Sequence, residues 1–135
     1  MKLVTDTNIL IRCSLGRAAD RVRALRLRGV HLVTTQRNAE EMVGVLQGVF
    51  GFDEKAALIE TARILRPFEV VESADYAHLR DAAERRLDVG GRNDWPALAA
   101  AMTLDAGIWS EDTDFFGVGV PVWSSRNVMI AAEAA

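Results

Sequence analysis

The chain has 135 residues, of which 50% are hydrophobic and 26% are charged, and its formal net charge is −3. Residues 1–135 fit a single domain with a core of its own, and the net charge excludes binding of nucleic acid through overall basicity. The sequence has one cysteine, no signal sequence and no apolar run near the roughly 18 residues of a membrane span, so we expect a cytoplasmic protein with no disulfide and no membrane association.

Hydrophobic periodicity predicts strands and helices that alternate along the chain. In chain order, these are a strand at 2–5, helices at 8–16 and 17–29, a strand at 30–35, helices at 36–51 and 53–66, a strand at 68–72, helices at 73–88 and 94–107, strands at 108–110 and 120–124, and a short helix at 126–135. We expect Asp53, Ser73 and Asp94 as N-caps, and Gly107 as the end of the helix that Asp94 begins. The glycine-rich segment 87–95 is expected to be a mobile loop.

This alternation predicts an α/β domain with a mainly parallel central sheet of four or five strands. Sheets of this kind bind ligands at the carboxyl ends of their strands. Asp6 follows the first expected strand and Asp112 follows the fourth. A functional site is therefore expected where these two strands end.

Each acidic residue nearby also has an ordinary structural interpretation. Asp6 fits an Asx-turn or a helix cap, and Asp94 fits an N-cap in front of a helix with proline in its first turn. Glu40 and Glu41 both flank the apolar stripe of one helix, which is typical of a solvated face, and periodicity alone hardly separates them.

Asp112 and Asp114 fit simple turn residues as well. A calcium loop of the EF-hand type is excluded, because Phe116 would occupy its fifth position and Trp123 its twelfth. Zinc bound by histidine and cysteine has little support, since the two histidines are far apart in sequence, and a Ser–His–Asp triad has little support either.

Taken together, the acidic residues lie at strand ends and helix starts, and an α/β fold can bring them together. Several carboxylates repel one another unless a cation lies between them. Oxygen ligands of this kind suit Mg²⁺ or Mn²⁺, and such ions support hydrolysis of phosphodiester bonds. If these acidic residues converge, they therefore point to metal-dependent hydrolysis of phosphodiester bonds.

Four segments resemble the PIN domain family: VTDTNIL, TTQRNAEEMVGVL, RNDWPALAAAMTLDAGIWSEDTDF and GVGVPVWSS. They run from the first strand to about Ser124, which is most of the chain. The third segment is the most specific, since it joins an Asp that opens an alanine-rich helix to a short strand and a Ser-x-Asp-x-Asp-Phe sequence. The chain looks especially like single-domain bacterial and archaeal PIN proteins, many of which are toxins of toxin–antitoxin pairs (VapC-like).

The resemblance implies a three-layer α/β/α fold and a metal-dependent endoribonuclease that uses Mg²⁺ or Mn²⁺. The matched positions are the catalytic metal ligands Asp6, Glu41, Asp94 and Asp112, with Glu40 as the alternative to Glu41, the further acidic position Asp114, and the polar bracing residues Asn8 and Ser110. The implied partners are an RNA substrate, a cognate antitoxin and a second copy in a homodimer. Residues 46–52 and 58–65 are apolar and would form a dimer or antitoxin groove, or simply core.

Some basic surface must offset the acidic cluster if RNA is to bind. Arg17, Arg21 and Arg28 share a face of the helix at 17–29, and they could also be a solvated face. Arg92, close to Asp94, is the preferred candidate for a phosphate contact.

In the late segment IWSEDTDFFG, the strand carries Ser110 and Asp112 to the end of the sheet. Glu111 is expected to face water. Phe115 and Phe116 are expected to anchor the loop in apolar surroundings.

Other classes of protein fit less well. A phosphoryl-switch receiver needs an acidic pair after the first strand and a late lysine, but the last lysine is Lys55. A haloacid-dehalogenase-like phosphatase needs Asp-x-Asp, whereas Asn8 stands at the second position. A non-catalytic PIN-like protein that binds RNA or a partner, and a PIN nuclease that processes RNA without an antitoxin, remain open.

Overall fold

The computed structural model describes residues 1–134. Its five-stranded sheet has the order β3-β2-β1-β4-β5, and every neighbouring pair is parallel. The strands are β1 (Lys2–Thr5), β2 (His31–Thr35), β3 (Glu69–Val71), β4 (Gly107–Trp109) and β5 (Val122–Trp123). The predicted α/β class and the parallel sheet are therefore confirmed.

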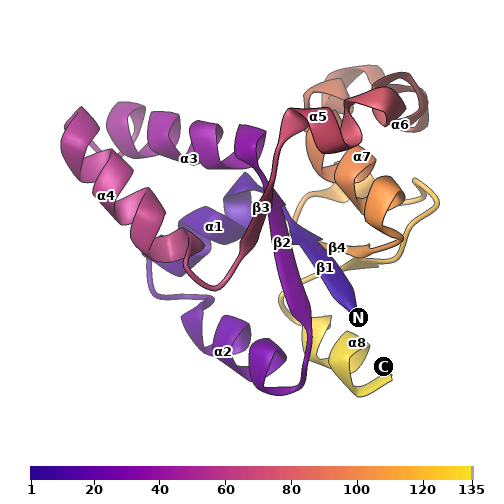
Figure 1. Cartoon of the computed structure of the whole chain (residues 1–135), viewed down its shortest axis with the longest axis horizontal. Coiled ribbons are helices and arrows are strands. Elements are labelled where there is room, and N and C mark those ends of the chain that lie inside the picture. Colours follow the sequence, from indigo (N-terminus) through magenta and orange to yellow (C-terminus); the bar gives the residue numbers. More distant parts are fainter. Residues whose placement is uncertain (135) are drawn as a thin grey trace.

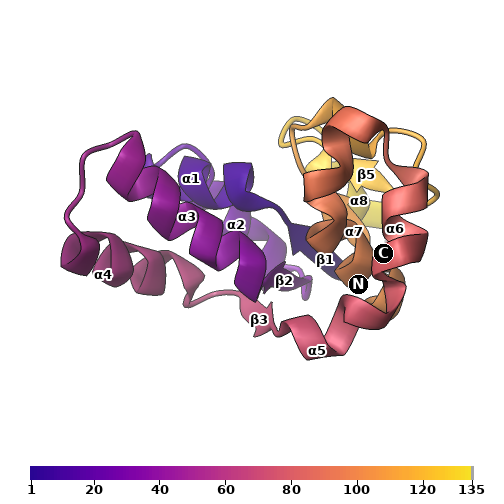
Figure 2. The same ribbon diagram turned by 90° about the horizontal axis from the view of Figure 1, so that it is seen from above.

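Helices cover both faces of this sheet (Figures 1 and 2). The α-helices are α1 (Thr7–Ser14), α2 (Ala19–Leu27), α3 (Gln36–Gly48), α4 (Glu54–Leu65), α5 (Ser73–Tyr76), α6 (Arg80–Arg86), α7 (Trp95–Leu104) and α8 (Val128–Ala134), and the short 3₁₀ helices are η1 (Ala77–Leu79), η2 (Val89–Asp94) and η3 (Thr113–Phe115). No helix among residues 1–134 is long and apolar enough to cross a membrane.

Side-chain alternation along the strands divides the core into two layers. Leu3 and Leu32 point to one face, where they pack with residues of α1–α4 and α8. Val4 and Val33 point to the other face and pack with α5, α6 and α7. Helix α7 is buried along most of its length, which explains why it is rich in alanine: small side chains let it lie close to the sheet. The two layers leave the carboxyl ends of β1 and β4 between α3 and α7 (Figure 1).

Three local predictions were wrong. The helix expected at 73–88 is divided into α5, η1 and α6, and its N-cap is Glu72 rather than Ser73, because Glu72 forms a reciprocal capping box with Asp75. Helix α7 ends at Asp105, whose φ of 51° stops the helix two residues before Gly107. The segment expected to be a mobile loop contains the 3₁₀ helix η2.

Gly107 has a different role from the predicted one, because it opens β4. A Cβ atom at this position would lie 3.2 Å from a methyl carbon of Leu3 and 3.2 Å from the carbonyl oxygen of Pro121. Glycine therefore lets β4 lie close to β1 and β5. This tight packing sets where β4 ends and where the residues that follow it are placed.

Candidate functional site

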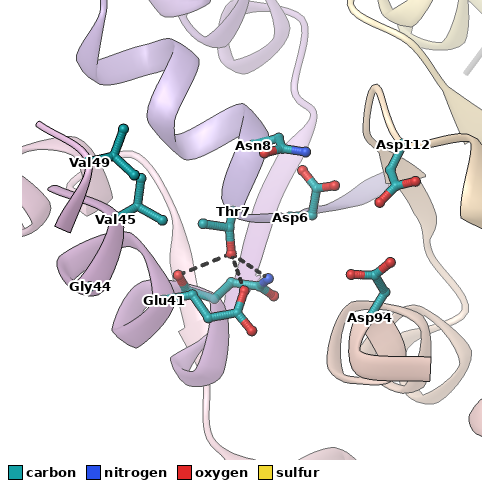
Figure 3. Close-up of a pocket in the computed structure, with 10 residues that line it drawn as sticks. Asp6, Thr7, Asn8, Glu41, Gly44, Val45, Val49, Asp94 and Asp112 are labelled. Carbon is teal, nitrogen blue, oxygen red and sulfur yellow. Dashed lines mark hydrogen bonds between the residues drawn. The ribbon is translucent and has the colours of Figure 1, made fainter. Parts of the chain in front are cut away.

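A pocket of about 470 Å³ lies at the carboxyl edge of the sheet. Its lining residues are Asp6, Thr7, Asn8, Asn38, Glu41, Gly44, Val45, Val49, Asp94 and Asp112 (Figure 3). Asp6 follows β1 and Asp112 follows its neighbour β4, while Asp94 lies at the junction of η2 and α7. Parallel strands end at the same edge, so residues more than 100 positions apart in the sequence face one another here.

The acidic side chains form a compact group. One carboxylate oxygen from each of Asp94, Asp112 and Asp114 lies within 4.8 Å of the other two. Asp6 faces Asp112 and Asp94 across the pocket (Figure 3). The structure therefore brings four of the five predicted acidic ligands together on one side of the pocket.

Asp6 is buried, and two groups fix its carboxylate. The backbone N–H of Ile9 donates to Oδ1 at 3.2 Å, which caps α1. The hydroxyl of Ser110 donates to Oδ2, and the same hydroxyl oxygen accepts the backbone N–H of Asp112 at 2.9 Å. Asp6 can thus both cap α1 and act as a ligand, because each of its oxygens accepts one hydrogen bond and keeps a lone pair for an ion.

The loop after β4 is organised by its own aspartates. Asp112 Oδ1 accepts the backbone N–H of Asp114 at 2.9 Å and caps η3. Gly91 of η2 packs against this loop, since a Cβ atom there would lie 2.9 Å from Cγ of Asp114. A side chain at position 91 would require Asp114 to shift, so Gly91 helps to set the position of Asp114, which its glycine-rich context did not reveal.

Glu41 lies on the opposite side of the pocket, in α3 (Figure 3). The hydroxyl of Thr7 donates to its Oε2 at 2.7 Å. Asn38 Nδ2 donates to the Thr7 oxygen at 3.0 Å, and the hydroxyl of Thr35 donates to Asn38 Oδ1 at 2.7 Å. Glu41 is therefore the glutamate that faces the pocket, and Glu40 does not line it.

Sequence reasoning missed Thr7 and Asn38. A signal for Asn38 was present: it stands one turn before Met42 and two before Leu46, on the buried stripe of α3. A polar residue on such a stripe is buried and needs hydrogen-bond partners. Thr7 had no comparable signal.

The acidic side of the pocket is electrostatically strained. Burial, assisted by the charges of Asp112 and Glu111 and opposed by the hydrogen bonds from Ser110 and Ile9, raises the pKa of Asp6 to about 6. Burial and the neighbouring carboxylate of Asp112 raise the pKa of Asp94 to about 7. At neutral pH these carboxylates are ionised at a cost, and a cation among them would relieve it.

The loop that carries Asp112 differs from its prediction in two details. Glu111 does not simply face water, because its carboxylate accepts the backbone N–H of Ser125. Partial burial would raise the pKa of Glu111, but the hydrogen bonds from Ser125 and the charges of Arg12 and Arg21 lower it overall. Of the two phenylalanines only Phe115 is an anchor, since it is fully buried while Phe116 is 67% exposed.

None of the basic residues expected to contact RNA lines the pocket. Arg17 precedes α2, and Arg28 approaches Glu133 at 3.7 Å, so the expected three-arginine face does not exist as a unit. Arg92 is exposed and does not line the pocket. Asn8 does line it, with its amide beside Asp6 (Figure 3).

The donor atoms suit a hard divalent ion. The polar atoms of the pocket are carboxylate, amide and hydroxyl groups, and its lining contains no histidine and no cysteine. Oxygen donors with several negative charges fit Mg²⁺ or Mn²⁺ rather than zinc. Asp6, Asp94, Asp112 and Asp114 are the residues that could hold such an ion.

A parallel α/β sheet with an acidic pocket at its carboxyl edge defines the class of protein to which this chain belongs. A family model described as the PIN domain matches residues 4–133. The chain is a member of the PIN domain family, and the resemblance of its four segments is thereby confirmed.

Solved structures with the same fold include three complexes. VapBC2 from Rickettsia felis, bound to a DNA fragment from their promoter, matches with a TM-score of 0.67 and 16% identity over 92% of this chain and 98% of the other. A toxin–antitoxin complex from Klebsiella pneumoniae matches with a TM-score of 0.67 and 20% identity, over 91% of this chain and 97% of the other. VapBC-1 from nontypeable Haemophilus influenzae matches with a TM-score of 0.62 and 17% identity, over 93% of this chain and 99% of the other. Comparison with curated proteins gives no match.

The raised pKa values predict how stability depends on pH. The pKa of each carboxyl is 3.8 in the unfolded chain and rises on folding, to about 6 for Asp6 and about 7 for Asp94. Between the unfolded and folded pKa values the folded chain therefore binds more protons than the unfolded chain. Their stabilising contribution is complete below about pH 4 and is lost as the pH rises through 6 and 7. Thermal unfolding with a chelator should show Asp94→Asn to be more stable than the wild type at pH 8 and similar to it at pH 4.

This prediction is a comparison of two proteins, so other titrating groups cancel. Asp88→Asn changes an exposed aspartate that does not line the pocket and makes no side-chain cap hydrogen bond, so it is the matched control and should follow the wild type. An Asp94→Asn protein whose stability runs parallel to the wild type from pH 4 to 8 would contradict the electrostatic strain.

Proposed function

We propose that this protein is an endoribonuclease that hydrolyses RNA phosphodiester bonds at the acidic pocket with Mg²⁺ or Mn²⁺, and that it is the toxin of a type II toxin–antitoxin pair. One observation carries the catalytic part: Asp6, Asp94 and Asp112, from three separate segments, line one pocket with Asp114 beside them, and two of these carboxyls have raised pKa values. Membership in the PIN domain family supports it. Perturbed carboxylates in a pocket are typical of catalytic sites.

Each residue has a defined task in this proposal. Asp6, Asp94 and Asp112 hold the ion, and Asp114 completes the acidic wall. When bound, Mg²⁺ or Mn²⁺ lowers the pKa of an attacking water and stabilises the leaving oxygen. Ser110 is a positioning residue, because its hydroxyl holds Asp6 and the backbone of Asp112 at once.

Glu41 acts from the other wall of the pocket. Its Oε2 accepts the Thr7 hydroxyl, which leaves the remaining carboxylate oxygen lone pairs available to a ligand, directly or through a water. We propose that Glu41 takes part in ion binding or orients the water that attacks the phosphate. No protein nucleophile is needed, because activated water supplies the new P–O bond.

The toxin role rests on different observations. A solved structure with this fold, from Klebsiella pneumoniae, is a toxin–antitoxin complex by its own description. Apolar side chains are exposed at the end of α3 and on α4: Val49, which lines the pocket, is 73% exposed, and Ile59 and Leu58 of α4 are 61% and 51% exposed. Exposed apolar residues that lie together mark protein contacts, so we propose that an antitoxin, or a second copy in a homodimer, covers this surface.

Replacing Asp6 tests the catalytic proposal. Asp6→Asn keeps the size of the side chain and the cap of α1 but removes the charge, so RNA cleavage with Mg²⁺ or Mn²⁺ should fall by at least about a hundredfold while the fold is retained. Cleavage of labelled RNA and circular dichroism measure the two outcomes. Full cleavage by the variant would refute the assignment, and calorimetry that finds no Mn²⁺ binding to the wild type would favour a non-catalytic protein that binds RNA or a partner.

A second test compares neighbouring glutamates of α3. Glu41→Gln should reduce RNA cleavage by about tenfold or more, because Glu41 faces the pocket, whereas Glu40→Gln should cleave like the wild type. Both changes remove the same charge from the same helix. Equal losses in the two variants would show that general charge, not the position of Glu41, matters.

A further inference from the structure

The pocket contains no basic residue among its lining side chains. A strand of RNA carries one negative charge per phosphate, and binding it near four carboxylates requires positive groups close by. Arginine is the natural source in this chain, which has fourteen arginines and two lysines. The arrangement of the arginines around the pocket therefore decides where a strand can run.

Arg12 and Arg21 differ from all other arginines. These two side chains are partly buried, whereas the remaining twelve are exposed. Neither forms an ion pair or a side-chain hydrogen bond within residues 1–134. Each guanidinium group is partly buried and near the Glu111 carboxylate but not in an ion pair with it, so it can still bind a phosphate, and little side-chain entropy is lost on binding.

Both arginines lie beside the acidic side of the pocket. Arg12 stands one turn after Asn8 in α1, so the two share a face, and Asn8 lines the pocket next to Asp6 (Figure 3). Arg21 lies in α2, which packs on α1. The positive charges of Arg12 and Arg21 also act on Glu111, the residue next to Asp112.

The opposite wall has a different character. Beside the negatively charged Glu41, this wall consists of Gly44, Val45 and Val49, and none of them offers a positive charge to a phosphate (Figure 3). An RNA backbone that leaves the pocket on this side would meet Glu41 and these apolar residues, which suit a protein partner better. The α1–α2 side is therefore the favourable exit for the strand.

We infer that the RNA strand runs from the acidic pocket past Asn8 onto α1 and α2, where Arg12 and Arg21 bind two of its backbone phosphates. This inference rests on the proposed function, since it names how the substrate of that site is held. The negative charge of Glu111 partly offsets the positive charges of Arg12 and Arg21. The hydrogen bond from Ser125 to Glu111 also links the loop of Asp112 to the segment after β5. The two arginines contribute affinity without sequence preference, because they contact phosphates.

Binding of a fluorescent single-stranded RNA to the cleavage-deficient Asp6→Asn protein in the presence of chelator tests this. Arg12→Gln with Arg21→Gln should weaken binding by about tenfold or more. Each lost phosphate contact should lower the slope of log affinity against log salt by about 0.7. Arg26→Gln, in the same α2 and exposed, is the matched control and should change neither quantity.

Wild-type protein provides a test that does not depend on folding of the variants. Modification by phenylglyoxal, followed by mass spectrometry, should show that RNA protects Arg12 and Arg21 but not Arg26. Unchanged affinity and salt slope in the double variant, an equal loss in Arg26→Gln, or no protection would overturn the inference. RNA binding is measured here without metal or cleavage, so failure of the proposed catalysis is seen separately, in the cleavage assay.

Discussion

The hydrogen bond from the Ser110 hydroxyl to the Asp6 carboxylate joins the ends of two neighbouring strands, and the site depends on it. The same oxygen accepts the N–H of Asp112, so one side chain sets the positions of two carboxylates that repel each other. Strand register places these residues side by side, and the tight packing at Gly107 fixes that register. The sheet thus holds the carboxylates of Asp6 and Asp112 close together in spite of their repulsion.

The pocket has two sides with different chemistry. On the side of β4 and α7, carboxylates converge and the pKa of Asp94 rises, which is the property that calls for a cation. On the side of α3, the hydrogen bonds that link Thr35, Asn38, Thr7 and Glu41 orient a single carboxylate, and apolar side chains continue outward from it. In the function we propose, these separate sides serve separate ligands: a metal and RNA at the acidic side and a protein partner at the other.

The sequence was enough to predict the α/β class, the parallel sheet and the family, because these depend on periodicity and on residues at strand ends. It also marked Asp6, Asp94 and Asp112, since acidic residues after strands or before helices meet at one edge. It could not separate Glu40 from Glu41 through periodicity, and it gave no indication of Thr7 or Gly91, whose roles come from contacts between distant segments. The expected cap was Ser73, whereas the observed cap is Glu72, because the reciprocal bond with Asp75 is visible only in three dimensions.

The central claim is that these carboxylates converge in order to bind a divalent ion. Anomalous diffraction from crystals soaked in Mn²⁺ tests it most directly. The account predicts a strong peak within coordination distance of carboxylate oxygens of Asp6, Asp94 and Asp112, and loss of that peak in Asp94→Asn crystals. A pocket without a peak, or a peak only at exposed acids such as Asp20 and Asp53, would contradict it.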